Sequence, residues 1–175
     1  MIAMKKIHLA LASLALGCLP AAGWAGETQE HKSVLQFGKP AALQQANEYY
    51  RLGKIEESLG FYDKALDEDM PKFMSYEANT NYCAALIEAG RYFRAKNQCK
   101  MAIDIVPWKW AAHYNLGVAL TRLGLYELAI SEFEIARLKS PQNVEITKAL
   151  SDVRKQLEDI APYVRKKAEL GGLAT

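Results

Sequence analysis

Histidine and cysteine, the side chains that metal sites and nucleophilic enzymes use most, are scarce in this sequence, with three of each in 175 residues. No serine, histidine and acid are spaced to form a catalytic triad, and there is no glycine-rich phosphate-binding loop or two-histidine metalloprotease pattern. The many carboxylates fall where amphipathic helices would expose them to solvent. We therefore expect a non-catalytic protein with no cofactor and no metal site.

The sequence also lacks an apolar run long enough to cross a membrane. The run Ile7–Leu19 ends at Pro20, which makes it shorter than the roughly 20 residues that span a bilayer as a helix. A basic start at Lys5 and Lys6 precedes this run, and a small-x-small site ending at Ala25 follows it. This pattern predicts a bacterial signal peptide at residues 1–25, cleaved after Ala25, and a periplasmic or secreted mature protein.

Two alternatives to cleavage remain open. The signal could be retained as an anchor, or the protein could be an outer-membrane lipoprotein acylated at Cys18, although Leu16 and Gly17 reverse the usual order of such a site. We expect contact with a membrane only in these two cases.

An excess of charge of one sign is missing as well. Residues 1–25 hold two of the 22 basic residues and none of the 20 acidic ones, so 20 of each sign remain in the mature chain. A chain without net charge has no strong attraction for nucleic acid or for an anionic membrane surface. We expect neither as the main partner.

What the sequence does have is an internal repeat. The stretch Pro107–Pro141 holds two runs, Trp110–Leu123 and Tyr126–Leu138, joined by a turn at Gly124. Apolar residues three and four apart place one apolar face on each predicted helix. The pattern recurs at Gly90, 34 residues earlier, and at Gly53, a further 37 residues earlier.

Small and large residues at fixed places mark each copy. They are Ala42, Gln45, Ala46, Tyr49, Ser58, Tyr62 and Pro71 in the first copy, Asn79, Tyr82, Cys83, Leu86, Ala95, Cys99 and Pro107 in the second, and His113, Leu116, Gly117, Leu120, Ala129, Phe133 and Pro141 in the third. This spacing resembles the tetratricopeptide repeat (TPR). The resemblance implies an all-α, right-handed superhelical solenoid of three helical hairpins at about 39–72, 76–109 and 110–143. A capping helix is expected at 144–160, a flexible lead-in at 26–38 and a tail at 161–175.

In TPR proteins the first helix of each pair lines a concave groove that holds the ligand. The resemblance implies that Leu43, Asn47, Tyr50, Arg51, Thr80, Asn81, Ala84, Ile87, Glu88, Tyr114, Asn115, Val118, Thr121 and Arg122 line it here. Asparagine pairs with the donors and acceptors of an extended backbone, and tyrosine adds flat apolar area with a polar tip.

We therefore expect a protein-interaction module or assembly scaffold of the bacterial envelope, whose partner is a peptide or helix segment of another protein. The alternative is a self-associating, homo-oligomeric platform or an anchored lipoprotein of a pilus or secretion assembly.

Some TPR proteins that bind cytosolic chaperones hold a terminal carboxylate with two asparagines and three basic residues. Asn47 and Asn81 match the asparagines, but Leu43, Ala111 and Asn115 stand at the basic positions. Without those charges a buried carboxylate would lack its counter-ions. We do not expect this ligand.

Cys83 and Cys99 lie at similar distances before and after the turn at Gly90. In a helical hairpin this puts them at about the same height, and an exported protein meets oxidising conditions. Packed helix axes are about 8–10 Å apart, whereas a disulfide needs Cα atoms within about 7 Å. A disulfide and a pair of buried thiols both remain open. A less favoured alternative is a thiol or metal protein that uses Cys83, Cys99 and His113.

Overall fold

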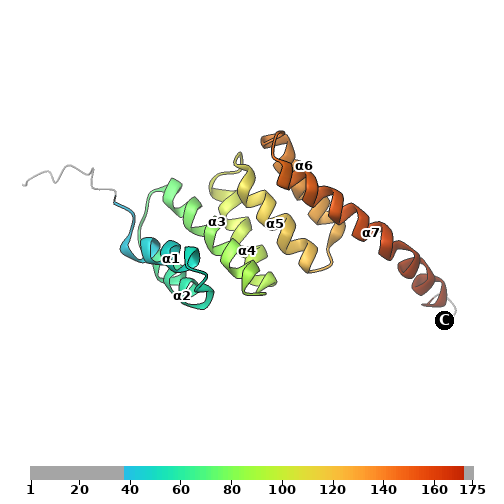
Figure 1. Ribbon diagram of the computed structural model, residues 1–175, viewed down its shortest axis with the longest axis horizontal. Helices are drawn as coiled ribbons and strands as arrows, with labels where there is room; N and C mark the ends of the chain where they lie inside the picture. Colours follow the sequence, from blue (N-terminus) through green and yellow to red (C-terminus); the bar gives the residue numbers. More distant parts are fainter. Residues whose placement is uncertain (1–37, 172–175) are drawn as a thin grey trace, which may run out of the picture. The chain divides into compact units, whose positions relative to one another are not determined.

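The computed structural model describes residues 38–171, which fold into seven helices without a strand among them (Figure 1). The helices are α1 (Ala41–Arg51), α2 (Ile55–Leu66), α3 (Lys72–Glu88), α4 (Tyr92–Ile105), α5 (Trp110–Arg122), α6 (Tyr126–Lys139) and α7 (Val144–Gly171). The predicted signal peptide with Ala25 and Cys18, the lead-in up to residue 37 and residues 172–175 lie outside the described residues. The predicted all-α class of hairpins with a capping helix is confirmed.

Three glycines end the first helix of each hairpin in the same way. Gly53, Gly90 and Gly124 have φ angles of 71°, 72° and 73°, in the left-handed region where a glycine has no side chain to strain. The residue after each glycine donates its backbone N–H to the carbonyl five positions earlier, as Arg91 does to Leu86 at 2.8 Å. This is the Schellman arrangement, and it explains why a glycine recurs at this place in every repeat.

Small residues let the two helices of a hairpin approach each other. Ala46, Ala95 and Ala129 are fully buried, and Gly117 is so close to α6 that an added Cβ would lie 2.7 Å from the ring of Phe133. Such contacts bring helix backbones together while the larger rings fill the space beside them.

The helices form two layers. The first helices α1, α3 and α5 contact one another in succession and α7 follows α5, whereas α2, α4 and α6 make no direct contact with one another within residues 38–171. Each of these three packs instead on the first helix of its own hairpin and on the helix that follows it. We call the exposed side of α1, α3, α5 and α7 the inner face.

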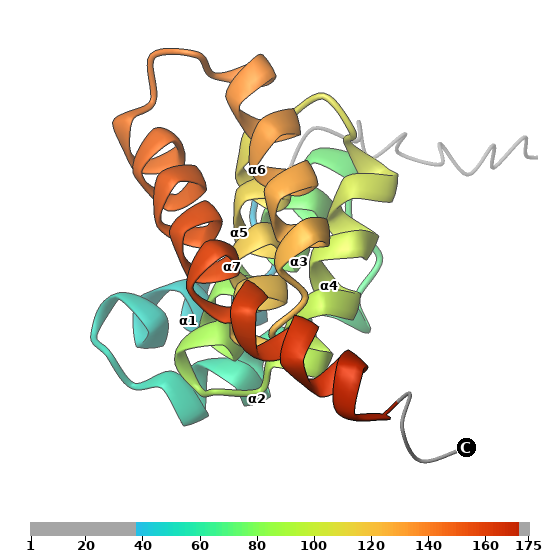
Figure 2. The same cartoon turned by 90° about the vertical axis from the view of Figure 1, so that its right-hand side faces the viewer.

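The last helix covers the end of the stack, which Figure 2 views from that side. Asn143 caps it, since its Oδ1 accepts the backbone N–H groups of Glu145 and Ile146 at 2.9 and 3.2 Å. The helix continues beyond residue 160 into the predicted tail. Pro162 removes one backbone donor, but no glycine interrupts the helix before Gly171. None of the helices described is both long and apolar enough to cross a membrane.

Candidate functional site

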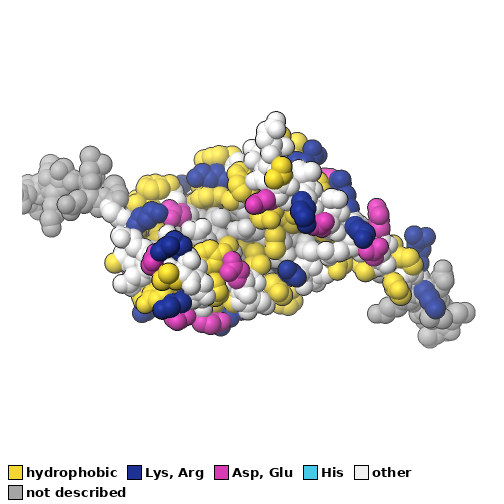
Figure 3. All heavy atoms as spheres, in the orientation of Figure 1, with side chains coloured by type: hydrophobic (Ala, Val, Ile, Leu, Met, Phe, Trp, Pro, Cys, Tyr) yellow, Lys and Arg dark blue, Asp and Glu magenta, His cyan; other side chains and the backbone are white. Residues whose placement is uncertain are grey.

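The inner face carries most of the residues expected to line the groove, and Figure 3 shows one side of the domain with hydrophobic, acidic and basic side chains mixed on it. Half-buried there are Asn47, Tyr50, Asn81, Ala84, Ile87, Tyr114, Asn115, Val118 and Thr121, while Arg51, Glu88 and Arg122 are exposed. These residues come from the three first helices, so the fold brings the three repeats together on one surface.

Two of the expected residues belong to the core instead. Leu43 is 0% exposed and Thr80 is 6% exposed, and the Thr80 hydroxyl donates to the carbonyl of Tyr76 at 2.7 Å. The helix that carries Thr80, α3, is the central one and packs on α1, α2, α4 and α5, so more than one of its sides is covered. Neither side chain is accessible to a ligand, and we leave both out of the candidate site.

A hydrogen-bond network centred on Asn47 links the first two repeats. Asn47 Oδ1 accepts from the Tyr62 hydroxyl at 2.8 Å and from Asn81 Nδ2 at 3.1 Å. Asn47 Nδ2 donates to Glu77 Oε1 at 3.1 Å, and the same oxygen accepts from Lys39 at 2.5 Å. The two amides are therefore held in fixed orientations beside a carboxylate.

A second tie joins Tyr50 to Glu88, whose Oε1 accepts the phenol hydrogen at 2.5 Å. Burial, followed by this carboxylate, raises the pKa of Tyr50 well above its usual value. The phenol is thus neutral and donating at any physiological pH. Arg51 lies at the edge, where it pairs with Glu48 of its own helix at 2.7 Å.

The third repeat contributes an aromatic and an amide group. The rings of Tyr114 and Phe133 lie 5.7 Å apart, and burial raises the pKa of Tyr114. Asn115 Nδ2 donates to the carbonyl of Thr80 at 3.3 Å, which ties α5 to α3.

A pocket of about 420 Å³ opens where α5 and α6 meet α7. Its lining consists of Val118, Thr121, Arg122, Tyr126, Phe133, Ala149, Asp152, Val153 and Gln156. We call it the α5–α7 pocket. It continues the inner face, because α5 supplies Val118, Thr121 and Arg122 to both.

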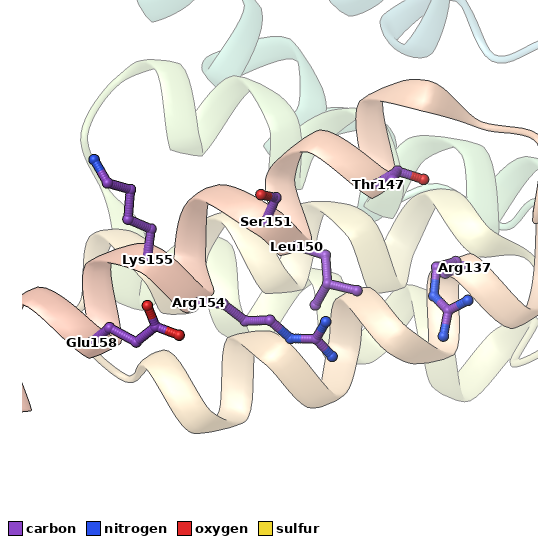
Figure 4. Close-up of a pocket in the computed structure, with 7 residues that line it drawn as sticks. All are labelled: Arg137, Thr147, Leu150, Ser151, Arg154, Lys155 and Glu158. Atoms are coloured by element: carbon purple, nitrogen blue, oxygen red, sulfur yellow. The ribbon is translucent and has the colours of Figure 1, made fainter.

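A further cleft of about 600 Å³ lies along α6 and α7, lined by Arg137, Thr147, Leu150, Ser151, Arg154, Lys155 and Glu158 (Figure 4). Leu150 points from α7 toward α6, whereas Lys155 points away from it. Arg154 is paired with Glu134 at 2.6 Å. The basic side chains of Arg137, Arg154 and Lys155 do not point toward one place in the cleft, so the cleft is not a convincing binding site for an anion.

Comparison with known proteins finds relatives by sequence and solved structures of similar fold, whereas no family model matches the chain. The chain is 27% identical over 135 residues to the pea (Pisum sativum) translocon at the outer membrane of chloroplasts 64, across 75% of this chain and 22% of that protein. It is 26% identical over 112 residues to a DnaJ homolog subfamily C member 7 homolog of Dictyostelium discoideum, across 63% of this chain and 21% of that one.

A solved structure of similar fold is the first TPR of Spaghetti (RPAP3) bound to the HSP90 peptide SRMEEVD. It superposes with a TM-score of 0.63 at 25% identity, and the match covers 67% of this chain and 90% of that one. Residues 38–171 have the TPR fold. TPR domains are non-catalytic interaction modules. The chain spans about a fifth of the length of the two relatives named above.

The TPR domain holds Cys83 and Cys99 in a disulfide with the Cα atoms 5.3 Å apart. Both ring nitrogens of His113 face oxygen atoms, Oε2 of Glu132 at 2.8 Å and the carbonyl of Pro107 at 3.1 Å. The described part of the chain contains no group of three side chains able to hold a metal ion. The alternative that joins both cysteines and this histidine in a thiol or metal site has no structural support.

Sequence reasoning missed Glu77, Lys39 and Tyr62, which complete the Asn47 network. Glu77 lies one helical turn before Asn81 on the same helix, so spacing alone could have placed it on the inner face. Reasoning from sequence also treated α7 only as a cap, although Ala149, Asp152 and Gln156 line a pocket there.

Proposed function

We propose that this TPR domain binds a segment of another protein on its inner face, as an interaction module or assembly scaffold. The observation that carries the proposal is the pair Asn47 and Asn81, two oriented amides on successive repeats, with Tyr50 and Tyr114 half-buried on the same surface. Amides and phenols suit the alternating donors and acceptors of a peptide backbone. A TPR of similar fold is known bound to a peptide, which supports this mode.

The partner segment differs from an acidic chain end. Glu88 places a carboxylate on the inner face beside Tyr50, whereas the carboxylate of Glu77 is paired with Lys39. Leu43, Ala111 and Asn115 stand where the chaperone-binding members have basic residues. A second carboxylate brought to this end of the inner face would be repelled. The segment that lies across α1 and α3 is therefore neutral or basic.

Loss of aromatic area from the inner face tests the proposal. Tagged wild-type protein and Tyr50→Ala/Tyr114→Ala are used to capture partners from an envelope extract, with circular dichroism as the check of fold. The double variant loses the captured partner. The matched control is Phe93→Ala/Trp108→Ala, which removes two aromatic rings, 71% and 68% exposed, from α4 and from the turn that follows it, and it keeps the partner.

Light scattering on the purified protein separates this proposal from self-association. A monomer at every concentration supports binding of another protein. A concentration-dependent oligomer that persists in Tyr50→Ala/Tyr114→Ala favours the platform.

We also propose that the protein is exported to the periplasm after cleavage at Ala25. The basic, apolar and small-x-small pattern of residues 1–25 supports this, and so does a disulfide, which is rare in reducing compartments. Fractionation with N-terminal sequencing tests it: we expect a periplasmic chain that begins at Gly26. An acylated chain that begins at Cys18 would instead establish the lipoprotein.

A further inference from the structure

We infer that the α5–α7 pocket is an anchor site for one large apolar side chain of the partner, next to a partner carboxylate that pairs with Arg122. This inference rests on the proposed function, because the pocket lies at the α7 end of the same inner face. The inference adds to the proposed function the kind of partner side chain that is bound and the place of the bound segment on the inner face.

The base of the pocket is apolar, whereas Thr121, Arg122, Asp152 and Gln156 make its rim polar. Phe133 and Val153 form the base and are 2% and 1% exposed, whereas Val118, Tyr126 and Ala149 are half-buried around them. At about 420 Å³ the pocket lies near the lower end of the range for ligand sites, about 300–1,000 Å³. This suits a single phenylalanine or leucine with its flanking backbone, the kind of anchor that dominates interface energies.

The small side chain of Ala149 keeps the space open. α7 packs mainly on α6 and only lightly on α5, with Ile146, Leu150 and Val153 as its buried residues. A larger residue at position 149 would fill the gap between α5 and α7.

The charged residues at the rim of the pocket determine which kind of partner residue can lie next to the anchoring side chain. Asp152 is paired with Lys148 at 2.7 Å, while Arg122 is exposed and makes no ion pair with any side chain that the structure describes. Arg122 is thus the available charge of the pocket, and a guanidinium binds a carboxylate through two parallel hydrogen bonds. The carboxylate of Glu88 lies at the end of α3, so the segment has its acidic residue at α5 and α7 and its neutral or basic part at α1 and α3.

Three exposed aromatic rings of this chain would fit the pocket poorly if a second copy offered them. Three exposed aromatic residues, Phe73, Phe93 and Trp108, stand beside Lys72, Arg94 and Lys109, whereas the exposed Tyr163 has no basic neighbour in the sequence. Docking any of the first three rings would bring a cation next to Arg122. Charge therefore disfavours these three rings of a second copy as the occupant.

The test is a titration of the ¹⁵N-labelled protein, followed by NMR, with three synthetic probes: N-acetyl-Phe-Asp-amide, N-acetyl-Phe-Lys-amide and N-acetyl-Gly-Asp-amide. The first probe shifts the backbone resonances of Val118, Ala149 and Val153. The lysine probe binds about fivefold more weakly, because exposed ion pairs contribute up to about 1 kcal/mol. The glycine probe produces no saturable shift.

Two variants complete the test. Arg122→Glu, at an exposed position that should leave the fold intact, inverts the preference between the aspartate and lysine probes. Its matched control, Arg137→Glu in the cleft of Figure 4, leaves the preference unchanged. Ala149→Phe fills the pocket and abolishes all shifts, with the remaining spectrum as its check of fold.

Each of the other possible results contradicts one specific part of the inference or of the proposed function. If no probe shifts the pocket while Tyr50→Ala/Tyr114→Ala still releases the partner, the anchor inference is wrong and the proposed function stands. If both phenylalanine probes bind equally, the carboxylate pairing with Arg122 is wrong. If pocket resonances shift with protein concentration alone, a second copy is the occupant. Capture that is indifferent to Tyr50 and Tyr114 contradicts the proposed function itself.

Discussion

Asn81 donates a hydrogen bond from its Nδ2 to the Oδ1 of Asn47 at 3.1 Å, which joins the first helices of two successive repeats through their side chains. The same oxygen accepts the Tyr62 hydroxyl at 2.8 Å. One amide oxygen of Asn47 therefore serves both its own hairpin and the next one.

Because Asn47 accepts both hydrogen bonds and Asn81 donates only one of them, replacing the two asparagines should lower the free energy of unfolding by different amounts. Asn47→Ala leaves the buried Tyr62 hydroxyl and the Asn81 amide without their acceptor, so we expect the free energy of unfolding to fall by about 2–3 kcal/mol. Asn81→Ala removes one donor and leaves Asn47 Oδ1 still bonded to Tyr62, which costs about 1 kcal/mol or less. Urea denaturation of both variants measures the difference, and equal losses would contradict the assignment of Asn47 as the shared acceptor.

The sequence predicted part of this network, and the reason for the remainder is physical. Repeat spacing placed Asn47 and Asn81 on the first helices of successive repeats. It could not place Tyr62, which lies on the other helix of its hairpin, or show that Glu77 turns toward the amides, because both depend on how the hairpins pack. Burial of Leu43 and Thr80 was missed because the repeat pattern does not report how many sides of a helix are covered.

The crossing of α5 and α6 gives a second prediction. In Gly117→Ala the new Cβ would lie 2.7 Å from the buried ring of Phe133, so the ring or the helices must shift. We expect a loss of about 1–3 kcal/mol in the free energy of unfolding. The matched control is Gly60→Ala in α2, which meets nothing within 4 Å and gains up to about 1 kcal/mol from helix propensity. A Gly117→Ala protein as stable as wild type would show that α5 and α6 are not packed this closely.

The disulfide gives a third prediction. Cys83 and Cys99 are 16 positions apart, and closing a loop of about this length stabilises a protein by about 3 kcal/mol in the chain-entropy model. Dithiothreitol should therefore lower the free energy of unfolding by about this amount in the wild type. It should have no effect on Cys83→Ala/Cys99→Ala, and equal sensitivity of the two proteins would rule out the bridge as the cause.

The sequence left the state of these cysteines open because ordinary helix packing separates the axes too far. Small residues decide the distance in this hairpin. Ala85, Ala95 and Ala102 are fully buried along α3 and α4, and the Cα atoms of the cysteines come within 5.3 Å.

The buried phenols predict sensitivity to alkali. Burial first, then nearby carboxylates, raise the pKa values of Tyr50 and Tyr82. Burial, then the charges of Tyr50 and Glu77, raise that of Tyr62. An unfolded chain releases these protons at about pH 10, whereas the folded chain keeps them. The contribution of these groups to stability is thus complete below about pH 9 and is lost as the pH rises above about 10.

Urea denaturation at a series of alkaline pH values measures this loss. Tyr62→Phe flattens the alkaline slope because one of the three phenols is gone. The exposed Tyr163→Phe serves as its control and keeps the wild-type slope. A wild-type free energy of unfolding that stays constant up to about pH 11 would contradict the raised pKa values.

The most direct test of the account is capture of the partner by wild-type protein, Tyr50→Ala/Tyr114→Ala and Phe93→Ala/Trp108→Ala, side by side from one extract. We expect the partner with the first and third proteins and its loss from the second, with the same helical circular dichroism for all three. Retention by Tyr50→Ala/Tyr114→Ala, or loss only from Phe93→Ala/Trp108→Ala, would show that the inner face is not the binding surface.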